Sequence, residues 1–169
     1  MENPQNPNPH DDQPVRILVA DADRSEHLLL TMAAEECQQH VHFDFVRTGD
    51  ELLRSLTNDS FPIPDLLLLD LHLPRVDAHS VLISVGLHER LTHLPVVVLA
   101  PQPSASDARA CYAFGAFHVG TKPRTFGDMV ELVDHLTDPE RTDAIRPFDL
   151  GSFDAKLTDE NTDIAELDG

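Results

Sequence analysis

Several residues that could take part in chemistry stand directly after apolar runs of the chain. They are Asp21, Asp23, Asp70 and Lys122. Ligands of a parallel sheet bind beyond the carboxyl ends of its strands, so these side chains are expected to meet at one rim. Clustered carboxylates raise one another's pKa, and a hard divalent cation such as Mg²⁺ relieves that repulsion. Together with the lysine ammonium, the cation would neutralise an incoming phosphoryl group, so the residue types predict phosphoryl transfer.

The elements that must position these residues follow from an alternation of short apolar runs with segments of helical periodicity, repeated five times from residue 15 onward. Strands are predicted at 16–20, 41–46, 65–69, 95–99 and 117–120. The runs 65–69 and 95–99 are almost wholly apolar, which predicts central strands covered on both faces. Residues 41–46 alternate apolar and polar side chains, as at a sheet edge. The pattern indicates an α/β domain with a parallel sheet.

Helices are predicted between these strands. They cover 25–38, a short segment that Thr48 or Asp50 would cap, 76–90, 104–114 with Gly115 as its C-cap, and 125–136. The first helix is expected to share one apolar face among Leu28, Leu29, Met32 and Cys37, and the last among Met129, Leu132, Val133 and Leu136. Cys37 and Cys111 lack metal-ligand spacing and are interpreted as small buried or half-buried hydrophobic residues.

Composition suggests three parts and limits the partners. Residues 1–14 are expected to be a disordered leader, 15–137 the folded domain, and 138–169 an acidic tail that is disordered rather than a docking segment. The formal charge of -18 disfavours a nucleic-acid partner, because a phosphate backbone would be repelled. No apolar run approaches the roughly 20 residues that span a bilayer, so we expect a cytoplasmic protein without a membrane partner.

Four blocks of the chain carry a family resemblance. RILVADAD, PDLLLLDLHLPRVDAHSVL, LPVVVLAP and GAFHVGTKP resemble the signature blocks of response-regulator receiver domains, over about residues 15–137. LDLHLPRVD and HLPVVVL are most similar to single-domain regulators that serve phytochrome-type histidine kinases. The resemblance implies a CheY-like, flavodoxin-like (βα)5 fold, doubly wound, with strand order 2-1-3-4-5.

The resemblance also implies roles for individual residues. Asp70 would accept a phosphoryl group from a sensor histidine kinase, and Lys122 would contact that group. Asp21, Asp70 and the backbone carbonyl of His72 would hold Mg²⁺, with Asp23 as a further candidate ligand. The Lys122–Pro123 bond is often cis in this family.

Three positions depart from the family pattern. The second acid after the first strand, which is the main metal ligand of the family, is Ala22 here. Ala100 stands where a Thr or Ser hydroxyl is expected at the end of the fourth strand, and Val119 stands in place of the aromatic switch residue. These departures predict weak magnesium binding and poor transmission of a phosphorylation signal.

Three functions compete. The first is a stand-alone receiver that is phosphorylated at Asp70 and signals by contact with a downstream protein that the sequence does not name. Any homodimer would use the helix 104–114, the strand 117–120 and the helix 125–136. The second is a pseudo-receiver that docks partners without phosphorylation, favoured by Ala22 and Ala100. The third is a haloacid-dehalogenase-like phosphatase using Asp21 and Asp23, which leaves Asp70 without a role. The receiver interpretation predicts no enzymatic activity beyond its own phosphorylation and dephosphorylation.

Overall fold

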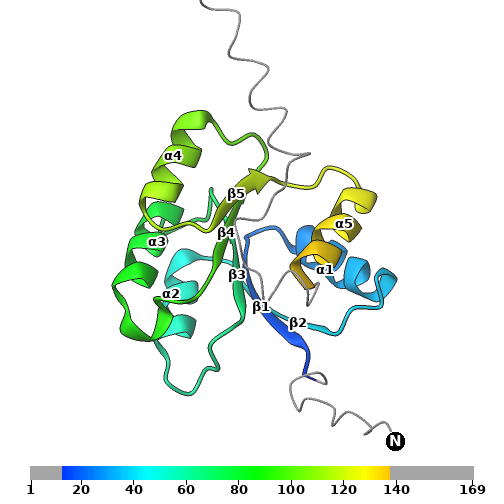
Figure 1. The fold of residues 1–169 in the computed structure, drawn as a ribbon, viewed down its shortest axis with the longest axis horizontal. Coiled ribbons are helices and arrows are strands. Elements are labelled where there is room, and N and C mark those ends of the chain that lie inside the picture. The colour runs from blue at the N-terminus through cyan, green and yellow to red at the C-terminus, as the bar shows by residue number, and fades with distance from the viewer. Residues whose placement is uncertain (1–12, 138–169) are drawn as a thin grey trace, which may run out of the picture.

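Five strands pair in parallel in a single sheet whose order is β2-β1-β3-β4-β5 (Figure 1). The computed structural model describes residues 13–137, so most of the predicted leader and the whole predicted tail lie outside the described residues. The strands are β1 Val15–Ala20, β2 Val41–Val46, β3 Leu66–Asp70, β4 Val96–Ala100 and β5 His118–Thr121. The predicted α/β class and strand order are confirmed.

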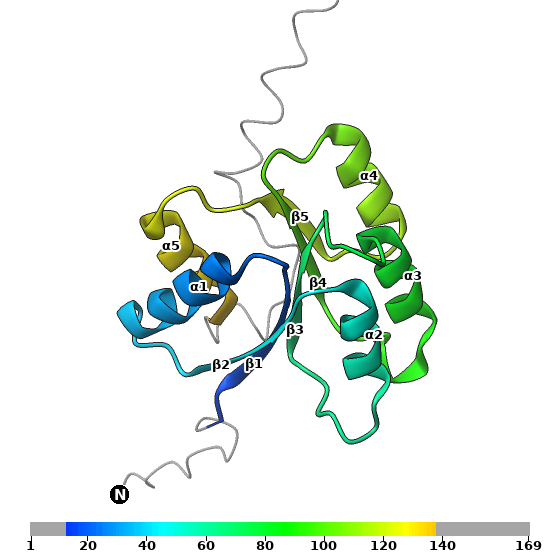
Figure 2. The ribbon, with the colours of Figure 1, turned by 180° about the vertical axis from the view of Figure 1, so that it is seen from behind.

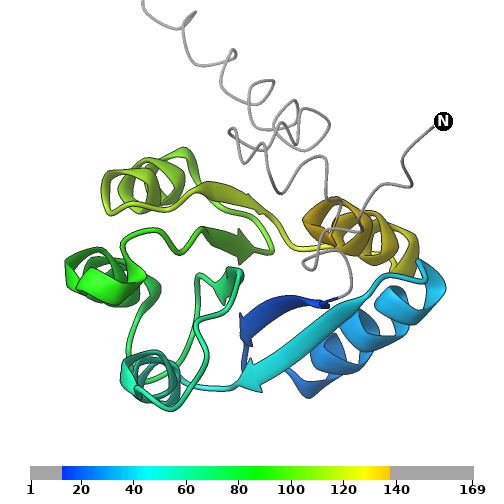
Figure 3. The ribbon, with the colours of Figure 1, turned by 60° about the horizontal axis from the view of Figure 1, so that its bottom comes forward.

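The helices lie in two layers, one on each face of the sheet (Figures 1 and 2). They are α1 Arg24–Glu36, α2 Gly49–Thr57, α3 Ala78–Leu87, α4 Ala105–Ala113 and α5 Phe126–Thr137, with a short 3₁₀ helix, η1 Glu89–Leu91. Helices α1 and α5 pack together on one face, and α2, α3 and α4 cover the other (Figure 3). The sheet is therefore doubly wound, as the parallel connections require.

Successive side chains of the central strand β3 enter different cores. Leu67 and Leu69 belong to the core under α2, α3 and α4, whereas Leu66 and Leu68 belong to the core under α1 and α5. All four are buried. This arrangement explains the continuous apolar run, because both faces of a central parallel strand are covered.

The expected apolar face of the first helix is wrong for two of its four residues. Leu28 and Met32 are 61% and 46% exposed, whereas Leu29 and Cys37 are partly buried and pack against the core. The fully buried residues of α1 are Leu30, Ala33 and Ala34. These three share the i, i+3, i+4 spacing of one helical stripe. The two alanines are small, so they let α1 lie close to the sheet and to α5, while Leu28 and Met32 lie on the exposed side of the helix. Hydrophobicity alone therefore does not identify the buried face of this helix.

Other helix predictions are confirmed, with one difference. Thr48 caps α2 by accepting a hydrogen bond from Glu51 N–H, and Gly115 has a φ of +94° just after α4, in the left-handed region that favours glycine. All four stripe residues of α5 are buried. However, α3 covers Ala78–Leu87 instead of 76–90, because Asp77 is its N-cap and His88 adopts an extended backbone.

The cysteine prediction is also confirmed. Cys111 is buried, Cys37 is partly buried, and both are free thiols. Across residues 13–137, no helix is long and apolar enough to cross a membrane.

Candidate functional site

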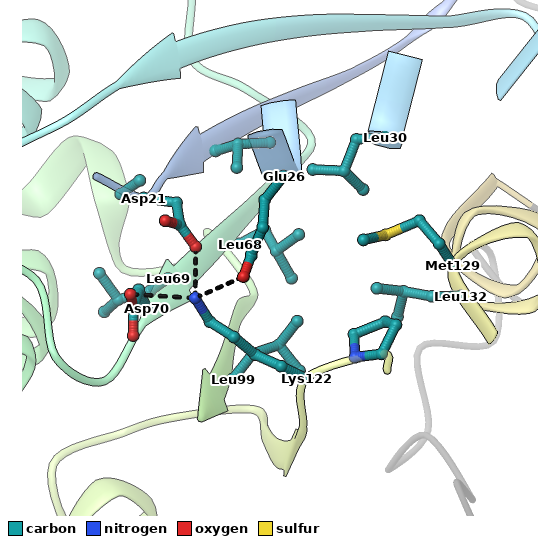
Figure 4. A pocket seen from close by; sticks show the side chains of 13 residues that line it. Asp21, Glu26, Leu30, Leu68, Leu69, Asp70, Leu99, Lys122, Met129 and Leu132 are labelled. Carbon is teal, nitrogen blue, oxygen red and sulfur yellow. Dashed lines mark hydrogen bonds and ion pairs between the residues drawn. The ribbon is translucent and has the colours of Figure 1, made fainter. Parts of the chain in front are cut away.

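The carboxyl ends of three strands bring Asp21, Asp70 and Lys122 together at one rim (Figure 4). Asp21 directly follows β1, and Asp70 is the last residue of β3. The Lys122 N–H donates to the carbonyl of Ala100 at 2.8 Å, which continues the β4–β5 pairing and places the lysine beside the end of β3. The sheet register, rather than proximity in sequence, thus builds the site.

The Lys122 ammonium lies at the centre of three carboxylates. Its Nζ is 2.6 Å from Asp21 Oδ2, 3.0 Å from Asp70 Oδ2 and 3.1 Å from Glu26 Oε1. The side chains of Lys122, Asp21 and Asp70 are at most 12% exposed, and that of Glu26 is 28% exposed. Because a lysine ammonium has three N–H donors, these three acceptors use all of them.

Burial and charge shift the titration of two members of this cluster. Burial lowers the pKa of Lys122, but the hydrogen bonds and charges of Asp21 and Asp70 outweigh burial and hold that pKa above its ordinary value. Burial, followed by the hydrogen bond and charge of Asp21, raises the pKa of Glu26 to about 7. Three carboxyl groups thus share one ammonium, and the site holds an excess of negative charge.

Glu26, on α1, is the site residue that the sequence analysis did not identify. It lies three residues after Asp23, the spacing of a helix N-terminal capping pair, so its position indicates an ordinary first-turn acid. Only the packing of α1 beside the ends of β1 and β5 shows that its carboxylate reaches Lys122.

Asp23 is turned away from this cluster. Its carboxylate accepts hydrogen bonds from Ser25 N at 2.8 Å and Ser25 Oγ at 2.6 Å, and it caps α1. Ser25 also holds the pKa of Asp23 below its usual range. Asp23 contributes to the site through its backbone, because its N–H donates to Asp21 Oδ1 at 2.7 Å.

The loop after Asp70 is tied to the phosphoacceptor candidate. The His72 N–H donates to Asp70 Oδ1 at 2.8 Å, and the His72 side chain is exposed. Pro74 accepts a hydrogen bond from the Gly49 N–H at 3.1 Å, which anchors the loop to α2.

The peptide bond between Lys122 and Pro123 is trans, as are all the peptide bonds of residues 13–137. The cis geometry that the family resemblance suggested is absent there.

The donor set suits a hard cation in kind but provides few ligands. In the described part of the chain, no group of three or more His, Cys, Asp or Glu side chains is arranged to hold a metal ion. Asp21, Asp70 and the carbonyl of His72 are oxygen donors of the class that Mg²⁺ prefers. The surplus of carboxylates over the single ammonium is the feature that favours a cation there.

The three departures from the family pattern have structural counterparts. Ala22 offers only its backbone carbonyl, which accepts a hydrogen bond from Arg47 Nε at 3.3 Å. Ala100 is fully buried beside the site, and Val119 is buried in the core under α4. The Val119 N–H donates to the hydroxyl of Tyr112 at 3.2 Å, so the aromatic ring beside β5 comes from α4.

Comparison with known proteins gives sequence relatives and similar structures. No family model matches the chain. It is 30% identical over 128 residues to FilR2 of Methanothrix harundinacea, described as a probable methanogenesis regulatory protein, covering 74% of this chain and 83% of the relative. It is 35% identical over 78 residues to the response regulator Rcp1 of Synechocystis, covering 46% of this chain and 53% of Rcp1.

Solved receiver structures share the fold. Response regulator RPA3017, from red-light signalling of R. palustris, is 28% identical with a TM-score of 0.66, covering 73% of this chain and 90% of that one. The Mn²⁺-bound form of Rcp1 is 25% identical with a TM-score of 0.66, covering 75% and 96%. With the strand order and the Asp70–Lys122 pair, these matches show that the chain belongs to the family of response-regulator receiver domains.

Proposed function

We propose that this receiver acts in the cytoplasm, accepts a phosphoryl group at Asp70 from a sensor histidine kinase and signals by protein contact. The observation that carries the proposal is the 3.0 Å contact between Asp70 Oδ2 and Lys122 Nζ at the carboxyl rim of the sheet. An Asp70 oxygen would attack the phosphorus of a kinase phosphohistidine, so that an O–P bond forms while the N–P bond to the imidazole breaks. The Lys122 ammonium would pair with a phosphoryl oxygen and stabilise its charge.

The direct test is intact-mass measurement after incubation with acetyl phosphate and magnesium. The expected result is one added phosphoryl group on the native chain and none on Asp70→Asn. Asp77→Asn is the matched control, because Asp77 is an exposed acid that caps α3 seven residues further along the chain. An added group that persists in Asp70→Asn would contradict the assignment.

A kinase of the phytochrome type is the partner we propose. The likeness to RPA3017 supports it, because RPA3017 is a response regulator in red-light signalling. Transfer of label from a phosphorylated phytochrome-type kinase should therefore be faster than transfer from a chemotaxis-type kinase. Equal or reversed rates would argue for another kinase class.

We propose that Asp21, Asp70 and the His72 carbonyl would hold Mg²⁺ weakly. The cation would offset phosphoryl charge when bound. Ala22 lacks the ligand that the family places there, and Mg²⁺ tolerates incomplete octahedral coordination badly. Affinity, measured by magnesium titration of amide spectra, should rise in Ala22→Asp and stay unchanged in Ala22→Asn. Equal behaviour of the two variants would contradict the assignment.

A pseudo-receiver that binds its partner without phosphorylation is the second candidate. The full use of the Lys122 donors by three carboxylates, together with Ala100, favours it. A native chain that gains no mass from acetyl phosphate, and whose partner binding survives in Asp70→Asn, would support this candidate over the first.

A homodimer through the face of α4, β5 and α5 also belongs to the proposal. Tyr112, Phe114 and Phe126 are 40–46% exposed in and near these elements. Sedimentation of the native chain should show a dimer that Glu131→Lys on α5 weakens and Glu35→Lys on α1 leaves intact. The reverse pattern would move the interface to α1.

A further inference from the structure

The Lys122 ammonium has no free N–H group for an additional hydrogen-bond acceptor. Its three N–H groups meet Asp21, Asp70 and Glu26, all within 3.1 Å. In the proposed function, a phosphoryl oxygen on Asp70 must also pair with this ammonium. One phosphoryl oxygen can take the place of the Asp70 oxygen that Lys122 contacts now. Any further contact between the ammonium and the phosphoryl group requires Asp21 or Glu26 to give up its hydrogen bond.

Glu26 is the acceptor held least firmly. Its contact with Lys122 is the longest of the three at 3.1 Å, and its side chain is 28% exposed against 6% for Asp21 and 12% for Asp70. The other two acceptors are also anchored by backbone N–H groups, Asp21 by Asp23 and Asp70 by His72. Glu26 is held by a side chain, through its contact with Lys122.

We infer that Glu26 is a positioning residue that holds Lys122 in the unphosphorylated site and competes with the phosphoryl group for its ammonium. This inference rests on the proposed phosphorylation of Asp70. While Glu26 keeps its contact, the lysine is aligned beside Asp70 but can donate to only one phosphoryl oxygen. A second contact between Lys122 and the phosphoryl group then includes the cost of detaching Glu26.

The position of Glu26 gives this competition a structural consequence. Glu26 lies in the first turn of α1, and its carboxylate borders a small cavity lined also by Leu30, Met129 and Leu132, between the rim and α5 (Figure 4). Release of Glu26 would change the contacts of α1 with α5. The state of Asp70 is thereby linked to the α1–α5 layer, by a route that needs neither a hydroxyl at residue 100 nor an aromatic ring at residue 119.

The test compares beryllofluoride affinity, in the presence of magnesium, among the native chain and three variants by titration of amide spectra. Glu26→Ala removes both the charge and the contact. Glu26→Gln removes the charge but keeps a side-chain oxygen that can accept from Lys122. Glu35→Ala removes an exposed acid further along the same helix and is the control.

The expected result is affinity roughly tenfold tighter for Glu26→Ala, the size of one lost competing charge-assisted hydrogen bond. Glu26→Gln should tighten it less, and Glu35→Ala should not change it. In the native chain, beryllofluoride should also shift amides of residues 26–30, and Glu26→Ala should diminish those shifts.

An equal rise in beryllofluoride affinity in Glu26→Ala and Glu26→Gln would overturn the inference. It would show that Glu26 acts only through its negative charge and not through its hydrogen bond with Lys122. Unchanged affinity in Glu26→Ala would overturn it as well. The ¹⁵Nζ signal of Lys122, recorded without any phosphoryl mimic, separates this inference from the proposed function. That signal should shift in Glu26→Ala and not in Glu35→Ala, even if Asp70 proves unable to bind beryllofluoride. An unchanged signal in Glu26→Ala would refute the claim that Glu26 positions the Lys122 ammonium.

Discussion

Lys122 is the residue on which the charge balance of the site depends. Its ammonium, 12% exposed, pairs with three carboxyl groups, and removing one partner of a buried ionic cluster leaves the others uncompensated. Lys122→Met should therefore lower the free energy of unfolding by about 3–5 kcal/mol, measured by urea denaturation at neutral pH.

An exposed ion pair provides the comparison for that measurement. Arg54 pairs with Asp50 on α2 and is 75% exposed, so Arg54→Met should cost less than about 1 kcal/mol. Similar losses in the two variants would show that the carboxylates around Lys122 are well solvated, contrary to their burial.

Glu26 should make stability depend on pH. Its pKa rises to about 7 in the folded chain, so between its unfolded value and 7 the unfolded state ionises while the folded state keeps its proton. Stability relative to Glu26→Gln should thus be highest below pH 4.5 and fall by about 1–2 kcal/mol by pH 7.5, allowing for partial exposure to solvent. Urea denaturation of both proteins across this range measures the difference, and a constant difference would contradict the raised pKa.

At the scale of elements, the start of α2 supports the loop that follows Asp70. A Cβ on Gly49 would lie 2.3 Å from the carbonyl oxygen of Val76 and 2.6 Å from its Cβ, closer than atoms can approach. Gly49→Ala should therefore push the loop away and destabilise the fold by about 1–3 kcal/mol. Amide spectra should change along residues 70–77.

Gly86 in α3 is the matched control, because a Cβ there would meet no atom within 4 Å. Gly86→Ala should stabilise the protein by up to about 1 kcal/mol through helix propensity. Equal effects of the two substitutions would show that the loop yields freely and that α2 does not constrain the Asp70 loop.

At the scale of the whole molecule, phosphorylation of Asp70 should cause little conformational change at the edge strand β5. The side chain of Ala100 has no hydroxyl to donate to a phosphoryl oxygen, and Val119 is buried with its N–H bound to Tyr112. A ligand shifts a conformational equilibrium only by its different affinity for the two states, so losing one charge-assisted hydrogen bond, roughly 1.5–3 kcal/mol, shrinks the shift about tenfold or more. Amide shifts caused by beryllofluoride should therefore stay small across residues 117–120.

Restoring both missing side chains provides the positive control. In Ala100→Thr with Val119→Tyr, the beryllofluoride shifts should extend into β5. Large shifts at residues 117–120 of the native chain would instead show that the hydroxyl and the aromatic ring are dispensable. Amide shifts along α1 and α5 would be compatible with this prediction, because release of Glu26 is expected to change the contacts of these two helices.

Local pattern was sufficient to predict the sheet, and the reason is physical. Strands β3 and β4 are apolar without interruption because helices cover both their faces, and β2 alternates because it is an edge. Side chains that end such strands must meet at one rim, so Asp21, Asp70 and Lys122 could be expected to lie together from sequence alone.

Tertiary packing determined which residues of α1 are buried and which acids contact Lys122, because both depend on distances between different helices and strands. Which face of α1 is buried followed from its packing against α5, and the apolar residues of α1 alone did not show that Leu28 and Met32 lie on the exposed side. Asp23 and Glu26 are both acids near the start of α1, but the direction of the helix turns the first toward Ser25 and carries the second to Lys122. Sequence thus determined which strands end in charged groups. Only the folded chain determined which acids share the lysine, because hydrogen bonds form within about 3 Å and the spacing of residues along a chain does not measure that distance.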